Sequence, residues 1–265
     1  MTKVLINYAT PDFRRSQRVN LRSGVEIAGF DRAIGYRTAD IDREFYRQNR
    51  HILNYTRGVG YWLWKPYFVV QTLRNLNTGD FLFYSDAGSI FMEPIDHLTK
   101  LALKHENEVM VFSTVFVEKQ WTKRDAFLLV GCDSPKYTET LQRAATFSLW
   151  RKSAYSMEVA EQWLHYCQDR RIITDEDNVL GLPNYPEFSE NRHDQTVLSL
   201  ITKLRKITAY RPLHAKGNSV KHLFPNSPYP QIMNLTRRSH NSVAIRLARR
   251  YEQYLRRYKG GVRYL

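Results

Sequence analysis

The chain has 265 residues, of which 43% are hydrophobic and 25% are charged, and its formal net charge is +14. This much apolar material can bury a large core, so the composition excludes a chain that is disordered throughout. No apolar run approaches the roughly 20 residues that cross a bilayer, and two cysteines are too few for a disulfide framework. The N-terminal segment reads as a strand rather than a signal peptide, which predicts a cytoplasmic protein.

The positive charge is concentrated at the C-terminal end. Residues 237–265 contain nine Lys or Arg and a single acid, Glu252, so this segment carries +8 and leaves +6 for the rest of the chain. Apolar and tyrosine residues recur there at three- and four-residue steps, which predicts a basic amphipathic helix. Such a helix suits an anionic membrane surface and a peripheral position on it. Packing on its own domain explains the same pattern, and a nucleic-acid contact is the least favoured reading.

The first 115 residues alternate between strand and helix patterns. Strands are predicted at 3–9, 31–36, 81–85 and 109–113, and helices at 16–29, 41–53, 66–75 and 95–105. Pro66 suits the first turn of its helix, where a missing N–H costs little. The alternation predicts an α/β fold with a mostly parallel sheet that helices cover on both faces.

The second half is less regular. Helices are predicted at 121–130, 153–168 and 196–204, a strand at 146–150, and a long loop at 175–191. The loop is a candidate lid, and packed surface is the alternative. No linker divides the chain, so we expect one domain over 1–236 followed by the basic segment 237–265.

A carboxylate stands at the end of the buried strand predicted at 81–85. Asp86 is followed by Ala87 and Gly88, which have almost no side chain. Ligands of parallel α/β sheets lie beyond the carboxyl ends of the strands. The first predicted strand ends at that same edge, with Tyr8, Ala9 and Thr10. Asp86 could hold a divalent cation or a sugar hydroxyl, and an Asp that caps the next turn explains the same residues without a ligand.

Two further groups of residues stand at predicted helix starts. Lys65 precedes Pro66, and its ammonium could meet a phosphate or lie in solvent. His193, Asp194 and Gln195 open the helix predicted at 196–204. A carboxylate there can simply cap the helix.

Together these motifs resemble the GT-A-type glycosyltransferases. Tyr84-x-Asp86-Ala87-Gly88 is similar to the Tyr-x-Asp-Ala-Asp of the glycogenin-like retaining transferases, with Gly88 in place of the second Asp. The block Gly58-x-Gly60-Tyr61-Trp62-x-Trp64-Lys65-Pro66 and the run Arg192-His193-Asp194-Gln195 are typical of a broad set of bacterial and viral relatives. The resemblance covers roughly residues 3–220 and leaves the basic tail outside.

The resemblance implies a GT-A-like fold with a mixed, mostly parallel sheet. Residues 1–115 would bind the nucleotide sugar, and residues 116–236 would receive the acceptor. The implied reaction moves a sugar from a UDP- or GDP-type donor to a glycan or lipid-linked acceptor in surface polysaccharide or lipopolysaccharide synthesis. By analogy, the stereochemistry leans towards retention.

The resemblance also assigns residues to roles. The donor would contact seven residues: Tyr8, Ala9, Thr10, Lys65, Asp86, Ala87 and Gly88. Asp194 and Gln195 would be catalytic, either deprotonating the acceptor or holding the donor sugar and stabilising positive charge at its ring. Four residues could face the acceptor: Trp121, Lys123, Arg124 and His193. The stretch that begins at Trp121 could equally lie on the diphosphate side, and solvated charge pairs explain its charged residues as well.

A metal site is implied as well. Asp86 and His214 would hold a divalent cation, and a histidine ligand favours Mn²⁺ over Mg²⁺. Because Gly88 replaces the second carboxylate, a metal requirement does not follow from the motif itself. An ordinary histidine in a surface loop explains His214 equally well.

Two other functions fit parts of the sequence. A sugar-nucleotide nucleotidyltransferase of the same fold usually carries a Gly-rich basic loop after the first strand, which Tyr8-Ala9-Thr10-Pro11 does not provide. A basic module that binds nucleic acid predicts binding that weakens steeply with salt and has no need for Asp86.

Overall fold

The computed structural model describes residues 1–235, so the helix predicted in 237–265 lies outside the described residues. Its centre is a six-stranded sheet in the order β2-β1-β3-β6-β5-β7. These strands are β1 (Lys3–Tyr8), β2 (Arg32–Tyr36), β3 (Phe81–Ser85), β5 (Val109–Val117), β6 (Leu141–Arg151) and β7 (Ala209–Tyr210). A separate two-stranded sheet pairs β4 (Ser89–Phe91) with β8 (Met233–Leu235).

The main sheet is mixed and mostly parallel, as predicted. β1 runs parallel to both β2 and β3, and β7 runs parallel to β5. Only β6 is reversed within this sheet, because it pairs antiparallel with β3 on one side and with β5 on the other. The carboxyl ends of β1 and β3 therefore lie side by side at one edge of the sheet, where parallel sheets commonly bind ligands.

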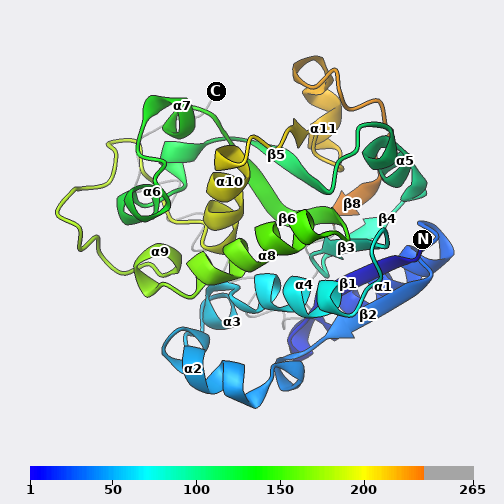
Figure 1. The fold of residues 1–265 in the computed structure, drawn as a ribbon, viewed down its shortest axis with the longest axis horizontal. Helices are drawn as coiled ribbons and strands as arrows, with labels where there is room; N and C mark the ends of the chain where they lie inside the picture. The colour runs from blue at the N-terminus through cyan, green and yellow to red at the C-terminus, as the bar shows by residue number, and fades with distance from the viewer. Residues whose placement is uncertain (236–265) are drawn as a thin grey trace, which may run out of the picture.

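Helices cover both faces of the sheet. The helices are α1 (Arg14–Glu26), α2 (Arg43–Leu53), α3 (Gly58–Tyr61), α4 (Trp64–Arg74), α5 (Asp96–Lys104), α6 (Arg124–Val130), α7 (Pro135–Thr138), α8 (Ala154–Cys167), α9 (Arg170–Ile173), α10 (Asp194–Leu204) and α11 (Lys216–Ser219). Figure 1 shows α4, α8 and α10 side by side across one face. α1 and α5 pack on the opposite face, where Leu98 and Leu101 of α5 are buried.

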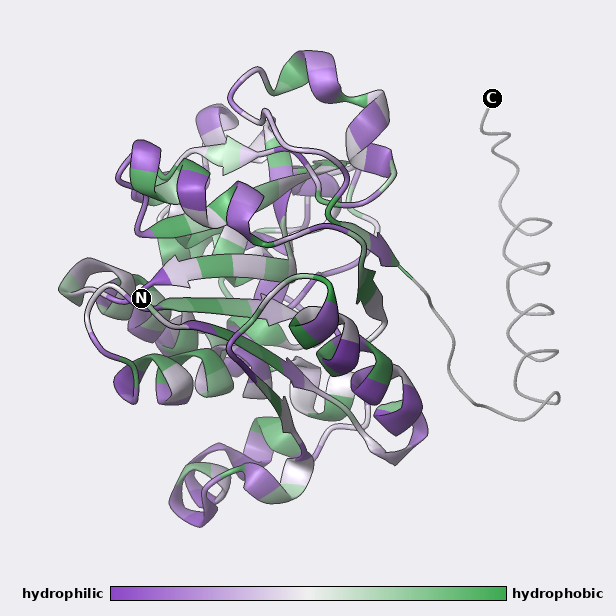
Figure 2. Ribbon diagram, turned by 90° about the vertical axis from the view of Figure 1, so that its right-hand side faces the viewer, coloured by the Kyte–Doolittle hydropathy of each residue, from purple (hydrophilic) through white to green (hydrophobic). Residues whose placement is uncertain are grey.

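The core divides into two clusters because successive side chains of a strand point to opposite faces. In β3, Leu82 and Tyr84 point towards α4, α8 and α10, whereas Phe81 and Phe83 point towards α1 and α5. Figure 2 shows the apolar residues concentrated on the strands and the hydrophilic residues on the outer helical surfaces. The strand that leads to Asp86 is thus held rigidly between two apolar layers.

Several elements differ from the sequence-based expectation. β6 begins at Leu141 rather than at 146, because its first residues are buried against α10 and pair with β5. β8 comes from a segment in which no strand is predicted, and it pairs with β4, which begins three residues after Asp86. α3 lies in a stretch where the sequence predicts no helix, and its backbone is left-handed.

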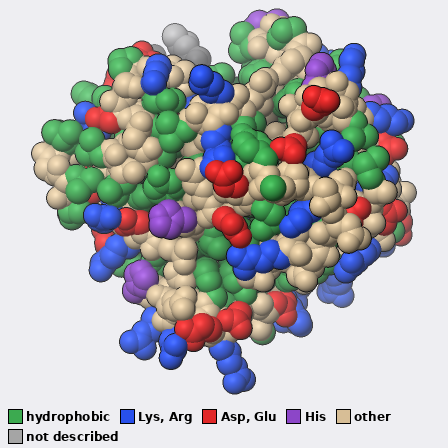
Figure 3. Space-filling view, viewed as in Figure 1, with side chains coloured by type: hydrophobic (Ala, Val, Ile, Leu, Met, Phe, Trp, Pro, Cys, Tyr) green, Lys and Arg blue, Asp and Glu red, His purple; other side chains and the backbone are tan. Residues whose placement is uncertain are grey.

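The surface of the described residues is electrically mixed. Figure 3 shows Lys and Arg side chains intermixed with Asp and Glu across the face that carries α4, α8 and α10. Within residues 1–235, we find no helix that is both long enough and apolar enough to cross a bilayer.

Candidate functional site

A cavity of about 710 Å³ opens at the carboxyl ends of β1 and β3. Its lining includes six of the seven residues predicted to contact a donor: Tyr8, Ala9, Thr10, Asp86, Ala87 and Gly88. These residues come from two segments almost eighty positions apart, and the parallel pairing of β1 with β3 brings them together. The size suits a nucleotide-sized ligand, since ligand pockets commonly measure about 300–1,000 Å³.

Asp86 projects into this cavity from a fixed backbone. Its N–H donates to the Thr146 carbonyl of β6 at 2.8 Å, and the Tyr84 hydroxyl donates to its Oδ1 at 2.7 Å. The carboxylate remains 42% exposed. Burial raises the pKa of Tyr84 well above its usual range, and the nearby Asp86 carboxylate adds to that rise, so the phenol stays a hydrogen-bond donor. Asp86 is therefore an oriented and accessible carboxylate.

Lys65 lies beneath Asp86 in the first turn of α4. Its side chain is 5% exposed, and its Nζ lies 2.8 Å from Asp194 Oδ2 and 3.5 Å from Asp86 Oδ1. Nζ also donates to the Ala145 carbonyl at 3.1 Å. Burial lowers the pKa of Lys65, but the carboxylates of Asp194 and Asp86 outweigh burial and leave that pKa raised. The lysine predicted to contact the donor thus connects the two carboxylates from below and does not line the cavity.

Asp194 is the first residue of α10, where the free N–H groups and the helix dipole favour a carboxylate. Its side chain is 5% exposed. Burial raises the pKa of Asp194 to about 6, although Lys65 opposes the rise. The Trp163 indole N–H donates to the Asp194 carbonyl at 2.8 Å and fixes the helix start against α8. At neutral pH the buried pair is therefore a carboxylate and an ammonium ion.

Gln195 is held by a buried polar network. Its Oε1 accepts from the Ala145 N–H at 3.2 Å, and its Nε2 donates to Gln142 Oε1 at 2.7 Å. Gln142 in turn donates to the fully buried carboxylate of Glu118 at 3.0 Å, which also pairs with Lys203. A primary amide has a second N–H and a second acceptor site, so these bonds orient Gln195 without using its full capacity.

A left-handed turn forms one wall of the cavity. Five consecutive residues, 58–62, have positive φ, from 51° at Tyr61 to 86° at Gly60. Bonds between residues four apart close the turn, with the Tyr61 N–H donating to the Arg57 carbonyl at 2.8 Å. Left-handed helix costs about 1–2 kcal/mol for each residue that is not glycine. Val59, Tyr61 and Trp62 carry that cost, and Val59 and Trp62 line the cavity.

His193 lies behind this wall. It has φ 55° and ψ −119°, which glycine normally adopts. Its ring is buried, stacks on Trp62 with centroids 5.2 Å apart, and its Nδ1–H donates to the Ile173 carbonyl at 2.7 Å. Burial lowers the pKa of His193 to about 4, so the ring is neutral. The structure places His193 behind the donor cavity rather than on a surface open to an acceptor.

The described residues do not make a metal site by themselves. Among residues 1–235, no three or more His, Cys, Asp or Glu side chains lie together as a cation would need. Asp86 Oδ1 already faces Tyr84 and the ammonium of Lys65. His214 packs against Phe147, with ring centroids 6.0 Å apart, and is not among the cavity residues. Binding of Mn²⁺ by Asp86 and His214 stays a prediction.

The remaining residues predicted for the acceptor side make structural contacts. The Arg192 guanidinium lies 4.2 Å from the Trp121 ring centroid. Arg124 pairs with Asp133 at 2.9 Å and lies over the Tyr185 ring. These contacts leave the acceptor role of Trp121 and Arg124 a prediction.

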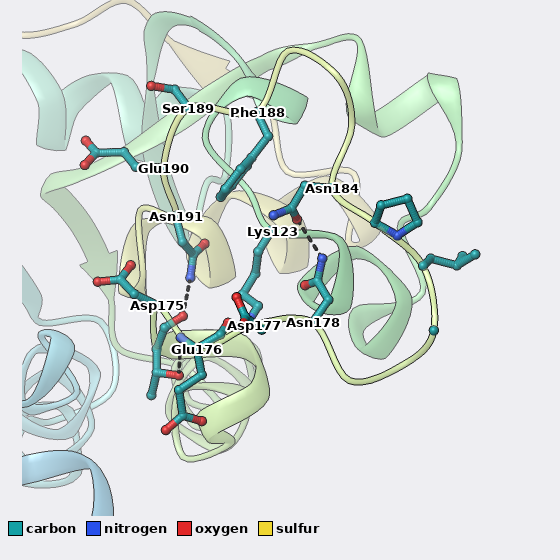
Figure 4. Close-up of a pocket in the computed structure, with 14 residues that line it drawn as sticks. Lys123, Asp175, Glu176, Asp177, Asn178, Asn184, Phe188, Ser189, Glu190 and Asn191 are labelled. Atoms are coloured by element: carbon teal, nitrogen blue, oxygen red, sulfur yellow. Dashed lines mark hydrogen bonds between the residues drawn. The ribbon is translucent and has the colours of Figure 1, made fainter.

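The loop predicted as a lid encloses a second cavity, of about 590 Å³, which Lys123 also lines. Figure 4 shows this cavity, with Lys123, Phe188 and the amides of Asn178 and Asn184 around it. Lys123 donates to the Glu176 carbonyl at 2.5 Å, and the buried Asp125 accepts from the N–H groups of Val179 and Leu180. The loop is thus fastened to α6 by hydrogen bonds.

The sequence did not reveal every residue of the site. Tyr84 was part of the recognised motif, yet only the structure shows its bond to Asp86. The contact between Trp62 and His193 joins residues more than a hundred positions apart, and the bond between Gln195 and Gln142 joins residues 53 positions apart. Gly58 and Gly60 did signal positive φ, but nothing in the sequence marks Val59 as left-handed.

No protein-family model matches the chain, and no curated protein is similar to its sequence. Solved structures do match. Mouse xyloside xylosyltransferase 1, in its apo form, has a TM-score of 0.50 and 10% identity over 91% of this chain and 99% of that chain. The galactosyltransferase LgtC, with donor and acceptor sugar analogues, has a TM-score of 0.49 and 12% identity over 94% of each chain. The layered mixed sheet and the first of these likenesses agree: the chain has the fold of the GT-A-type glycosyltransferases.

Proposed function

We propose that this protein is a glycosyltransferase that moves a sugar from a nucleotide diphosphate sugar to a glycan or glycolipid acceptor. The observation that carries the proposal is the cavity at the ends of β1 and β3, where Asp86 stands exposed and is tied through buried Lys65 to Asp194. The fold supports the same activity, since the similar solved structures are a xylosyltransferase and a galactosyltransferase.

Each part of the cavity has a role in this proposal. The nucleoside lies against Tyr8, Ala9 and Thr10, and the small residues Ala87 and Gly88 let the diphosphate approach the backbone. Asp86 accepts hydrogen bonds from the donor at its exposed carboxylate. Lys65 acts from below, because its buried ammonium fixes the positions of Asp86 and Asp194 relative to each other.

In this proposal Asp194 and Gln195 serve the donor sugar, from a position next to the cavity rather than in its lining. Asp194 is 5% exposed and paired with an ammonium, which suits a carboxylate that stabilises developing positive charge better than one that must accept the proton of an acceptor. We therefore favour retention of configuration over inversion. Gln195 holds the donor sugar through the part of its amide that the Gln142 bond leaves available.

The setting of the reaction is part of the proposal. The +8 charge of residues 237–265 favours an anionic surface, so we place the enzyme at the cytoplasmic face of a membrane, acting on a lipid-linked or lipopolysaccharide acceptor. The donor is of the UDP or GDP type. If a cation takes part, we expect Mn²⁺ rather than Mg²⁺.

Thermal shift against UDP, GDP and their hexose conjugates tests donor binding, with and without Mn²⁺ or Mg²⁺. A ligand at 100 times its dissociation constant stabilises the fold by about 2.7 kcal/mol, which raises the melting temperature measurably. We expect one diphosphate series to stabilise the wild type and not Asp86→Ala. If none of these compounds shifts the wild type in any metal condition, the proposed function is wrong.

A further inference from the structure

Strained backbone is concentrated at one contact beside the donor cavity. Six residues other than glycine have positive φ among residues 1–235: Val59, Tyr61, Trp62, Glu106, His193 and Lys206. Glu106 and Lys206 each lie just beyond a helix end, where this conformation is ordinary. Three of the others meet in space, because the centroid of the His193 ring lies 4.9 Å from that of Tyr61 and 5.2 Å from that of Trp62, and Val59 belongs to the same turn as these two residues.

The surrounding residues leave this turn little freedom. A Cβ on Gly60 would lie 2.6 Å from Leu53 Cα, and a Cβ on Gly58 would lie 2.3 Å from the Trp62 ring. The Trp64 indole N–H also donates to the Gly58 carbonyl at 2.9 Å. The turn is therefore a rigid piece of backbone with cavity-lining side chains on one side and His193 on the other. Strain of this kind persists only where packing enforces it, and it is most common at functional sites.

The peptide after His193 leads directly into Asp194. His193 is held by the Trp62 stack on one side and by its bond to the Ile173 carbonyl on the other, and its Nε2 is buried without a hydrogen-bond partner. A ring held in this way fixes the unusual backbone of His193, and with it the direction in which Asp194 enters α10. The contact between Trp62 and His193 therefore connects the wall of the donor cavity with Asp194, the carboxylate that forms an ion pair with Lys65.

We propose that the left-handed turn 58–62 and His193 form a positioning device, in which Trp62 lines the donor site and, through His193, sets the position of Asp194. Trp62 and His193 act in this way as positioning residues rather than catalytic ones. The inference rests on the proposed function, since the position of Asp194 matters only if Asp194 serves the transfer.

The first test separates binding from turnover at Trp62, using the sugar nucleotide that the wild type consumes fastest among UDP- and GDP-hexoses. Trp62→Ala should raise the donor KM and lower kcat by up to about 100-fold, because small misplacement of a catalytic group has effects of that size. Trp62→Phe keeps a ring against His193 and should restore most of kcat while the donor KM stays raised. If Trp62→Ala changes KM alone, Trp62 only binds the donor and the proposed link to Asp194 is wrong.

The second test compares two substitutions that relieve the same kind of backbone strain. Val59→Gly lies in the turn, and Lys206→Gly lies beyond α10, away from the cavity. Glycine adopts positive φ freely, so both substitutions relieve strain, but Val59→Gly also removes a side chain that packs against the core and should have the lower melting temperature. The kcat values are therefore compared well below both melting temperatures. Only Val59→Gly should lower kcat, because a more flexible turn no longer fixes His193. Equal kcat values in the two variants would overturn the inference.

Failure of the inference is distinct from failure of the proposed function. If the wild type consumes no sugar nucleotide, the proposed function fails before any variant is compared. If the wild type turns over its donor and both Trp62→Ala and Val59→Gly keep the wild-type kcat, the transferase activity stands and the positioning role is excluded.

Discussion

The ammonium of Lys65 lies 2.8 Å from the carboxylate of Asp194, and both side chains are only 5% exposed. Such a pair offsets a large desolvation cost only while both partners are present. Asp86 is the exposed third member of the group, at 3.5 Å from the same ammonium. The site is therefore built so that one accessible carboxylate and one buried carboxylate share a single cation, and several testable consequences depend on that arrangement.

Removing the ammonium should destabilise the fold. Lys65→Met leaves Asp194 buried and unpaired, which costs about 3–5 kcal/mol in the free energy of unfolding. Urea denaturation followed by fluorescence measures this loss. The matched control is Arg74→Met, which breaks an ion pair with Glu161 whose side chains are 53% and 49% exposed, and it should cost less than about 1 kcal/mol. Similar losses of unfolding free energy in Lys65→Met and Arg74→Met would mean that burial of the Lys65–Asp194 pair does not make its disruption more costly.

The activity should depend on the ionisation of Asp194. Because burial raises the pKa of Asp194 to about 6, kcat/KM should rise with pH and level off above that value. Titration of His193 does not explain a rise of kcat/KM near pH 6, since burial lowers the pKa of His193 to about 4. A pH–rate profile checks this point, and Asp194→Asn should show a low rate without the limb near pH 6. A limb that persists unchanged in that variant would assign it to another group.

Stability should respond to pH in the opposite sense. The pKa of Asp194 is higher in the folded chain, about 6, than its ordinary value of 3.8, so folding favours the protonated form. This group stabilises the fold fully below about pH 4, and that contribution is lost as pH rises through about 6. We compare the unfolding free energy of the wild type with that of Asp194→Asn. Between pH 4 and pH 7 the wild type should lose about 2 kcal/mol relative to the variant. A difference that is constant with pH would contradict a raised pKa.

The turn beside the cavity should not accept a side chain at Gly60. Gly60→Ala combines φ 86° with a Cβ only 2.6 Å from Leu53 Cα, so it should lose about 1–2 kcal/mol to strain and about 1–3 kcal/mol more to overpacking. Gly79→Ala is the control, because φ is 92° there but no atom lies within 4 Å of the new Cβ. Chemical denaturation of both variants gives the comparison. Equal losses would show that the turn has more room than the structure indicates.

Loss of the Asp125 carboxylate should make the loop 175–191 more mobile. This buried carboxylate accepts from the Val179 N–H at 2.7 Å and the Leu180 N–H at 3.3 Å. Asp125→Ala removes both bonds, so amide exchange and protease cleavage in this loop should increase while the core strands stay protected. Mass spectrometry after brief exchange or digestion locates the change. Unchanged protection of the loop would mean that other contacts hold it.

The sequence predicted the sheet better than its details. Alternation of strand and helix patterns revealed β1, β2, β3 and the first part of β5, and β3 and the first part of β5 are continuous buried runs. The predicted strand was shorter than β6. The first residues of β6 include Gln142 and Arg143, and buried polar residues look like a loop until their partners are known. β8 was missed because its partner, β4, lies far away in the chain and both strands have only three residues.

In the candidate site, too, local motifs were predicted and contacts between distant segments were not. Asp86 and Asp194 were recognisable from local motifs, and the structure places both within reach of Lys65. Lys65 itself was expected to meet a donor and is buried beneath the cavity, because two carboxylates and the Ala145 carbonyl from distant segments surround it. His193 was assigned to the acceptor side, but its stacking on Trp62 is a tertiary contact that no local pattern records.

Turnover of sugar nucleotides by the full chain tests the central claim most directly. Release of UDP or GDP from a panel of hexose donors should be measurable for the wild type with at least one of them. Asp86→Ala and Asp194→Ala should each release it at least about 100-fold more slowly, as expected for groups that orient the donor or stabilise charge at its reacting carbon. Wild-type rates in both variants, or no donor consumption by the wild type, would contradict the account.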